Sequence, residues 1–158
     1  MTMNTLQADL LKGLTDAQSA ELLALGVRRQ YPTGAELFPL GAAANSVFLI
    51  ERGRVALTLP MQVQGHEEDV MVEERDGGQV VGWSGLIPPH RFTLKATAQL
   101  QTDTIVLDRE VLVAHFEKHP DVGYLVTRNV ASVTGQRLQI FQTMWLREMQ
   151  RAVDHRYA

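Results

Sequence analysis

The sequence predicts an α+β fold in which an antiparallel β-sandwich or barrel is preceded by one helix and followed by a short helix and a long one. In the region 27–107, short runs of β-branched, aromatic and aliphatic residues alternate with glycine and proline turns. A capped helical pattern precedes this region, and a long amphipathic pattern without proline follows it. Short strands at this spacing are typical of antiparallel sheets, so we expect the β region to form the body of the molecule.

Length and composition favour one folded domain with an appendage. The 158 residues are 45% hydrophobic and 21% charged, which argues against disorder. The formal net charge of -3 argues against a chain-wide surface for nucleic acid. The absence of cysteine excludes disulfides and thiolate metal sites, and a cytoplasmic location fits best. The N-terminus lacks a signal-peptide pattern, and no apolar run reaches the roughly 18 residues of a membrane span, so we expect no membrane partner.

The first helix is expected over residues 16–25. Thr15 and Gln18 have the spacing of a capping box, and Gly26 is a helix-stop signal. The clearest strands are expected at 47–51, 55–59, 70–74 and 104–107. An acidic cluster follows the second of these strands and comprises Glu67, Glu68, Asp69, Glu73 and Glu74. We interpret this cluster as a solvated hairpin, because a metal site would need converging oxygens.

Two helices are expected after residue 107. Asp108 is a suitable N-cap for the short helix, and Pro120 ends it because the residue before a proline avoids the helical conformation. The long helix is expected from about 121 to 153, with apolar residues mostly three or four positions apart. These are Val122, Val126, Val130, Val133, Leu138, Phe141, Trp145 and Met149.

The length of the second helix predicts a partner. At 1.5 Å per residue it would extend about 50 Å, whereas a compact chain of this size is about 40 Å across. Its far half would expose a large apolar patch, so we expect a homodimer through this helix. We therefore divide the chain into a β domain with flanking short helices at 1–120 and a dimerisation helix at 121–158.

Several motifs occur along the chain in a characteristic order. They include Tyr31-Pro32-Thr33-Gly34, the hairpin sequence Val-Phe-Leu-Ile-Glu-Arg-Gly-Arg-Val at 47–55, and Gly-Gly-Gln-Val-Val-Gly at 77–82. With the order of the elements, they resemble the cyclic nucleotide-binding domain of the catabolite-activator superfamily over nearly the whole chain. The resemblance implies a β-roll of the double-stranded β-helix or jelly-roll type. It also implies a non-catalytic regulatory module that binds a small anionic ligand, with cAMP and cGMP as candidates, and signals through a helical dimer interface.

The resemblance also implies a ligand site. In that family, backbone N–H groups and an arginine bind the cyclic phosphate, and an acidic side chain binds the ribose. Trp83 stands in place of the usual glutamate and either caps a ligand or packs in the core. Arg91 stands near the position of the phosphate arginine, and a one-residue shift would place Phe92 there instead. The implied ligand-binding residues are Gly82, Trp83, Ser84, Gly85, Leu86, Arg91, Phe92, Thr93, Phe141 and Gln142.

Two functional hypotheses follow. The chain is a ligand sensor, or it is a degenerate cyclic nucleotide-binding fold that acts as a ligand-independent dimeric interaction module with Trp83 and Phe92 filling the site. No P-loop, nucleophile elbow or paired carboxylates indicate catalysis. His115 and His119 could share a metal ion, but no third ligand lies near them in the sequence, so no metal or other cofactor is predicted. The chain ends at Ala158, just after the long helix, so we expect no direct DNA binding and an output through an unknown protein partner.

Overall fold

The computed structural model describes residues 9–158. Residues 1–8, on which most of the expectation about a signal peptide rests, lie outside this part. The helical elements are η2 (Asp9–Leu11), α1 (Asp16–Ala24), η3 (Trp83–Gly85), α2 (Arg109–Lys118) and α3 (Pro120–Tyr157). The strands are β1 (Val27–Tyr31), β2 (Glu36–Phe38), β3 (Ser46–Arg52), β4 (Arg54–Val63), β5 (His66–Asp76), β6 (Val80–Val81), β7 (Lys95–Ala98) and β8 (Thr102–Asp108).

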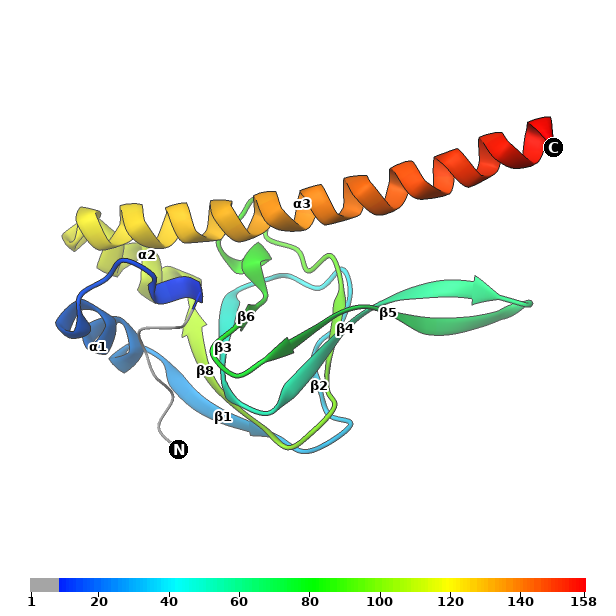
Figure 1. Cartoon of the computed structure of the whole chain (residues 1–158). Helices are drawn as coiled ribbons and strands as arrows, with labels where there is room; N and C mark the ends of the chain where they lie inside the picture. Colours follow the sequence, from blue (N-terminus) through cyan, green and yellow to red (C-terminus); the bar gives the residue numbers. More distant parts are fainter. Residues whose placement is uncertain (1–8) are drawn as a thin grey trace.

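The strands form two four-stranded antiparallel sheets, with the orders β1-β8-β3-β6 and β2-β7-β4-β5. β4 and β5 pair along their whole length, from Arg54 opposite Asp76 to Val63 opposite His66. The far end of this hairpin projects away from the rest of the roll (Figure 1). The predicted α+β fold class, with a β-roll between an N-terminal helix and two C-terminal helices, is therefore confirmed.

The predicted helix starts are confirmed by their capping bonds. Thr15 Oγ1 accepts from the backbone N–H of Gln18 at 3.1 Å, and Gln18 Oε1 accepts from the N–H of Thr15 at 3.0 Å. Asp108 Oδ1 accepts from the N–H groups of Glu110 and Val111, at 2.9 and 3.4 Å. These bonds satisfy backbone N–H groups that the first turn of a helix leaves without a partner. Because the bonded residues are only two or three positions apart, the local sequence indicates where α1 and α2 begin.

Two hydrophobic cores hold the elements together. One lies between the sheets and includes Phe38, Ile50 and Leu57. The other joins the β1-containing sheet to the helices and includes Leu107 and Val126. Apolar side chains of the N-terminal half of α3 belong to this second core, whereas the C-terminal half extends past the roll (Figure 1). No helix within residues 9–158 combines the length and the apolar character needed to cross a membrane.

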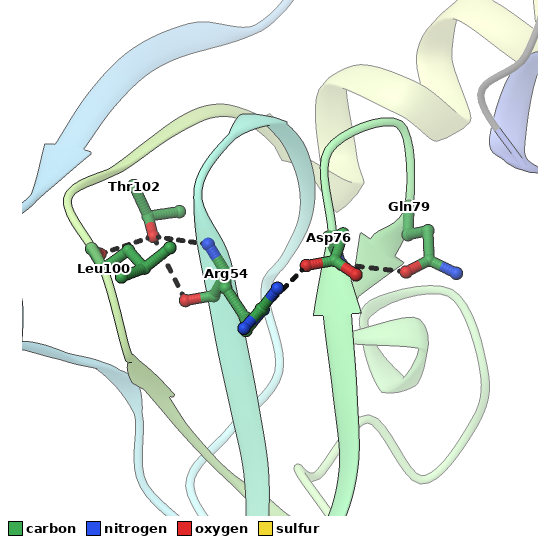
Figure 2. A network of polar contacts seen from close by, with 5 residues as sticks. All are labelled: Arg54, Asp76, Gln79, Leu100 and Thr102. Atoms are coloured by element: carbon green, nitrogen blue, oxygen red, sulfur yellow. Dashed lines mark hydrogen bonds and ion pairs between the residues drawn. The ribbon is translucent and has the colours of Figure 1, made fainter.

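A polar network ties three strands together at one end of the roll (Figure 2). Arg54 Nε donates to Asp76 Oδ1 at 3.0 Å, and the backbone N–H of Asp76 donates to Gln79 Oε1 at 2.8 Å. Buried Thr102 accepts from the N–H of Arg54 at 3.2 Å and donates to the carbonyl of Leu100 at 2.8 Å. These bonds link residues at the ends of β4, β5 and β8 and satisfy the buried hydroxyl of Thr102.

Candidate functional site

The predicted ligand-binding segment begins with a sharp turn after β6. Gly82 has a φ of +82°, in the left-handed region that favours glycine. Gly85 lies two residues after Trp83. A Cβ atom added to Gly85 would lie only 2.7 Å from the carbonyl oxygen of Ser46. The loop can therefore pack directly on β3 because Gly85 lacks a side chain.

Trp83 is a core residue. Its side chain belongs to the hydrophobic core beneath the helices, together with Leu49, Val80 and Val130, and the residue is 5% exposed. Its indole Nε1 is buried and has no hydrogen-bond partner among residues 9–158. Core packing, one of the two roles considered for Trp83, is therefore observed.

Phe92 packs into the core between the sheets. Its ring stacks on Phe38 with 3.7 Å between ring centroids and 11° between ring planes. Phe48 packs against the pair at an angle, with its centroid 6.5 Å from that of Phe92. Three aromatic rings from β2, β3 and the η3–β7 loop thus occupy the space beside the predicted ligand-binding segment.

A cavity of about 20 Å³ remains at this place. It is lined by Phe38, Leu57, Gly82, Trp83, Ser84, Phe92, Thr93, Leu94 and Arg137. A volume of this size holds about one water molecule, whereas small-molecule pockets usually measure about 300–1,000 Å³. The structure therefore gathers half of the predicted ligand-binding residues around one cavity, and that cavity is too small for a nucleotide.

The remaining predicted residues do not line this cavity. Arg91 is exposed, and its Nη1 donates to the carbonyl of Gly41 at 3.0 Å. Gly85 is buried against β3, and Leu86 lines a different hollow. Phe141 and Gln142 are exposed on the part of α3 that follows Arg137. The ligand contacts expected of these residues stay predictions.

The cavity contains one charged group that the sequence analysis did not select as a site residue. Arg137 reaches it from α3, and its Nη2 lies 2.9 Å from Glu73 Oε2 on β5. Glu73 Oε1 also pairs with Nη2 of buried Arg75 at 2.6 Å. The acidic hairpin is confirmed, but Glu73 is not one of its solvated carboxylates, because it joins two arginines. No local pattern could have identified this pair, since only the fold brings α3 to β5.

Arg137 is an incompletely satisfied cation. Its Nε and Nη2 are buried and make no hydrogen bond of good geometry with the described residues, although Nη2 is within ion-pair distance of Glu73. Burial lowers the pKa of Arg137, the carboxylate of Glu73 raises it, and the charge of Arg75 lowers it further. The net direction is downward, yet a guanidinium remains charged in proteins. The cavity wall therefore carries a guanidinium that is paired with Glu73 and whose Nε–H has no partner among the described residues, and such a group suits an anion that replaces Glu73.

A second hollow lies between the η3 loop, α2 and α3. It measures about 450 Å³ and is lined by Leu86, Ile87, Val113, Phe116, Thr127, Val130, Ala131 and Thr134. Most of these side chains are apolar and none is charged. This hollow suits apolar side chains better than a small anion.

Comparison with known proteins identifies the family. Residues 28–119, more than half of the chain, match the model of the cyclic nucleotide-binding domain. Glutaminase 1 from Bradyrhizobium diazoefficiens is 27% identical over 141 residues, which are 87% of this chain and 21% of that protein. The chain thus spans about a fifth of that relative's length, and the similarity concerns this part alone.

Solved structures share the fold. The catabolite activator protein of Thermus thermophilus has a TM-score of 0.76 at 23% identity, covering 87% of this chain and 62% of that one. The chain thus spans less than two thirds of that protein. A putative cyclic nucleotide-binding protein from Geobacter metallireducens has a TM-score of 0.70 at 23% identity, covering 87% of this chain and 98% of that one. The predicted resemblance is confirmed, and the chain belongs to the cyclic nucleotide-binding domain family.

Proposed function

We propose that the protein is a non-catalytic, ligand-sensing regulatory module whose β-roll binds a small anionic ligand, with cAMP and cGMP as the first candidates. The observation that carries this proposal is the position of Arg137 on the cavity wall beside Ser84 and Phe92. A guanidinium whose buried Nε–H has no partner among the described residues is suited to a phosphate or a carboxylate. The cavity also lies in the segment where the family resemblance implies the ligand.

Binding a nucleotide requires this small cavity to open further. Phe92 would leave its stack on Phe38, and Arg137 would exchange Glu73 for the ligand. The cost of this opening lowers the apparent affinity, because only the open fraction of the protein binds. Arg137 belongs to α3, so the exchange changes the contacts of the helix that leaves the roll. This link from ligand to helix is the proposed signal.

The proposal retains the other contacts expected from the resemblance. The backbone of residues 82–86 would surround the anion, and Arg91 would release the carbonyl of Gly41 to reach it. Two copies of the protein would pair through α3 and pass the signal to a protein partner in the cytoplasm. The exposed apolar side chains Leu138, Trp145 and Met149 on α3 support this pairing.

Affinity measurements on arginine variants test the site. We would titrate cAMP and cGMP into the unmodified protein, Arg137→Gln and Arg91→Ala by isothermal titration calorimetry. Losing a charge-assisted hydrogen bond costs about 1.5–3 kcal/mol, so Arg137→Gln should bind about 10 to 150 times more weakly. A similar loss in Arg91→Ala would assign a direct ligand contact to Arg91 as well. Arg128→Gln, which removes an exposed charge from α3, is the matched control and should bind normally. Unchanged affinity in both Arg137→Gln and Arg91→Ala would overturn the proposed site.

The alternative function is a ligand-independent dimeric interaction module. The observation that favours it is the stacked pair Phe38 and Phe92, which leaves a cavity of about 20 Å³. Under this alternative the aromatic rings replace the ligand permanently, and the titrations above give no binding heat. Arg91→Ala would then leave dimer stability and partner binding nearly unchanged.

A further inference from the structure

We propose that Glu21, His115 and His119 form a binding site for a divalent transition-metal ion such as Zn²⁺. One ring nitrogen of each histidine and one carboxylate oxygen of Glu21 all lie within 4.8 Å of one another. Two imidazoles and a carboxylate are a common set of protein ligands for Zn²⁺, and a water molecule can complete the coordination. This site is separate from the β-roll cavity and does not depend on what that cavity binds.

The backbone holds the two histidines on one side of α2. His115 lies in the last turn of α2, and His119 is the residue between α2 and α3. The N–H of His119 donates to the carbonyl of His115 at 2.9 Å, which continues the helical turn and places both rings on the same face. The ring centroids are 4.6 Å apart. Two ligands one turn apart on a helix can therefore reach one ion.

Glu21 supplies the third ligand from α1. Gln18, three residues earlier on α1, donates from Nε2 to Asp121 Oδ2 at 3.0 Å, so this face of α1 meets the first turn of α3. The carboxylate of Glu21 is thereby brought beside the α2–α3 junction. It lies far from the histidines in the sequence, which is why spacing alone did not reveal a third ligand.

The three side chains are close but not bonded to each other. Within the described residues, no hydrogen bond or ion pair links Glu21 to either histidine, and His115 Nε2 is buried without a partner. Ligand atoms on a tetrahedral Zn²⁺ are about 3.4 Å apart, given metal–ligand bonds of about 2.1 Å. Small side-chain rotations would bring the three groups to this separation. A bound ion would connect α1 to the junction of α2 and α3 and hold these helices together.

Metal titration of the whole protein tests the site. We would treat the untagged protein with chelator and titrate ZnCl₂ by calorimetry, then repeat with Co²⁺ and record its visible spectrum. We expect one saturable site per chain and d–d absorption bands typical of tetrahedral Co²⁺. His119→Gln and Glu21→Gln should each weaken Zn²⁺ binding at least 10-fold and remove the Co²⁺ bands.

Matched variants separate this site from general metal binding. His66→Gln and Glu117→Gln replace the same residue types outside the cluster and should bind Zn²⁺ like the unmodified protein. Far-ultraviolet circular dichroism would verify that every variant is folded. No saturable binding below about 1 mM Zn²⁺, or equal binding by His119→Gln and the unmodified protein, would overturn the proposal.

Discussion

Replacing Phe92 by alanine is expected to lower the free energy of unfolding by about 3–5 kcal/mol. Phe92 is 7% exposed and stacks on Phe38, so the substitution removes buried apolar surface and leaves a void between the two sheets. Urea denaturation at a fixed protein concentration measures this loss, and the fixed concentration matters because dimerisation would add to the apparent stability.

A matched substitution separates the loss of core packing from a general effect of mutation. Leu40 is 41% exposed, so Leu40→Ala should change the free energy of unfolding by no more than about 0.5 kcal/mol. A loss below about 1 kcal/mol in Phe92→Ala would contradict the assignment of its ring to the core. It would indicate instead that Phe92 spends much of its time outside the stack.

The double substitution Trp145→Glu and Met149→Glu is expected to raise the dimer dissociation constant at least about 100-fold. Both side chains are exposed on α3, at 62% and 45%. Truncating a central tryptophan in an interface commonly costs about 2 kcal/mol or more, and burying two carboxylates adds a desolvation cost. Sedimentation equilibrium over a range of protein concentrations measures the dissociation constant.

A charge-matched control accompanies this experiment. Gln136→Glu with Thr143→Glu adds two negative charges at exposed positions about 150° around α3 from Trp145 and Met149, as the helical repeat places them. This variant should dimerise like the unmodified protein. If the unmodified protein is a monomer at all accessible concentrations, or if both double variants dissociate equally, pairing through the Trp145 and Met149 face is wrong.

Local signals in the sequence predicted much of the fold. Thr15 with Gln18, and Asp108 before α2, cap helices through bonds within a few residues, so their spacing is sufficient to locate the helix starts. The long helix was expected from about 121 to 153 and spans Pro120–Tyr157. Its uninterrupted apolar repeat explains the agreement.

Other features depend on contacts between distant parts of the chain. β7, with the sequence Lys-Ala-Thr-Ala, has little β-strand character of its own and is defined by pairing with both β2 and β4. Arg137 meets Glu73 only because α3 passes the base of the β4–β5 hairpin. Glu21 likewise reaches the two histidines only through the packing of α1. Charged side chains carry no periodic signal, so neither Glu73 as the partner of Arg137 nor Glu21 as the partner of the two histidines was predictable from spacing.

Thermal unfolding of the unmodified protein, with and without millimolar cAMP or cGMP and a panel of other phosphorylated and carboxylated metabolites, tests the ligand-sensing proposal most directly. A ligand at 100 times its dissociation constant that binds only the folded state adds about 2.7 kcal/mol. For a chain of this size that corresponds to a rise in Tm of roughly 5–10 °C. We predict such a rise with at least one anionic ligand, cyclic nucleotides first. No rise with any member of the panel would contradict the sensor and favour the ligand-independent interaction module.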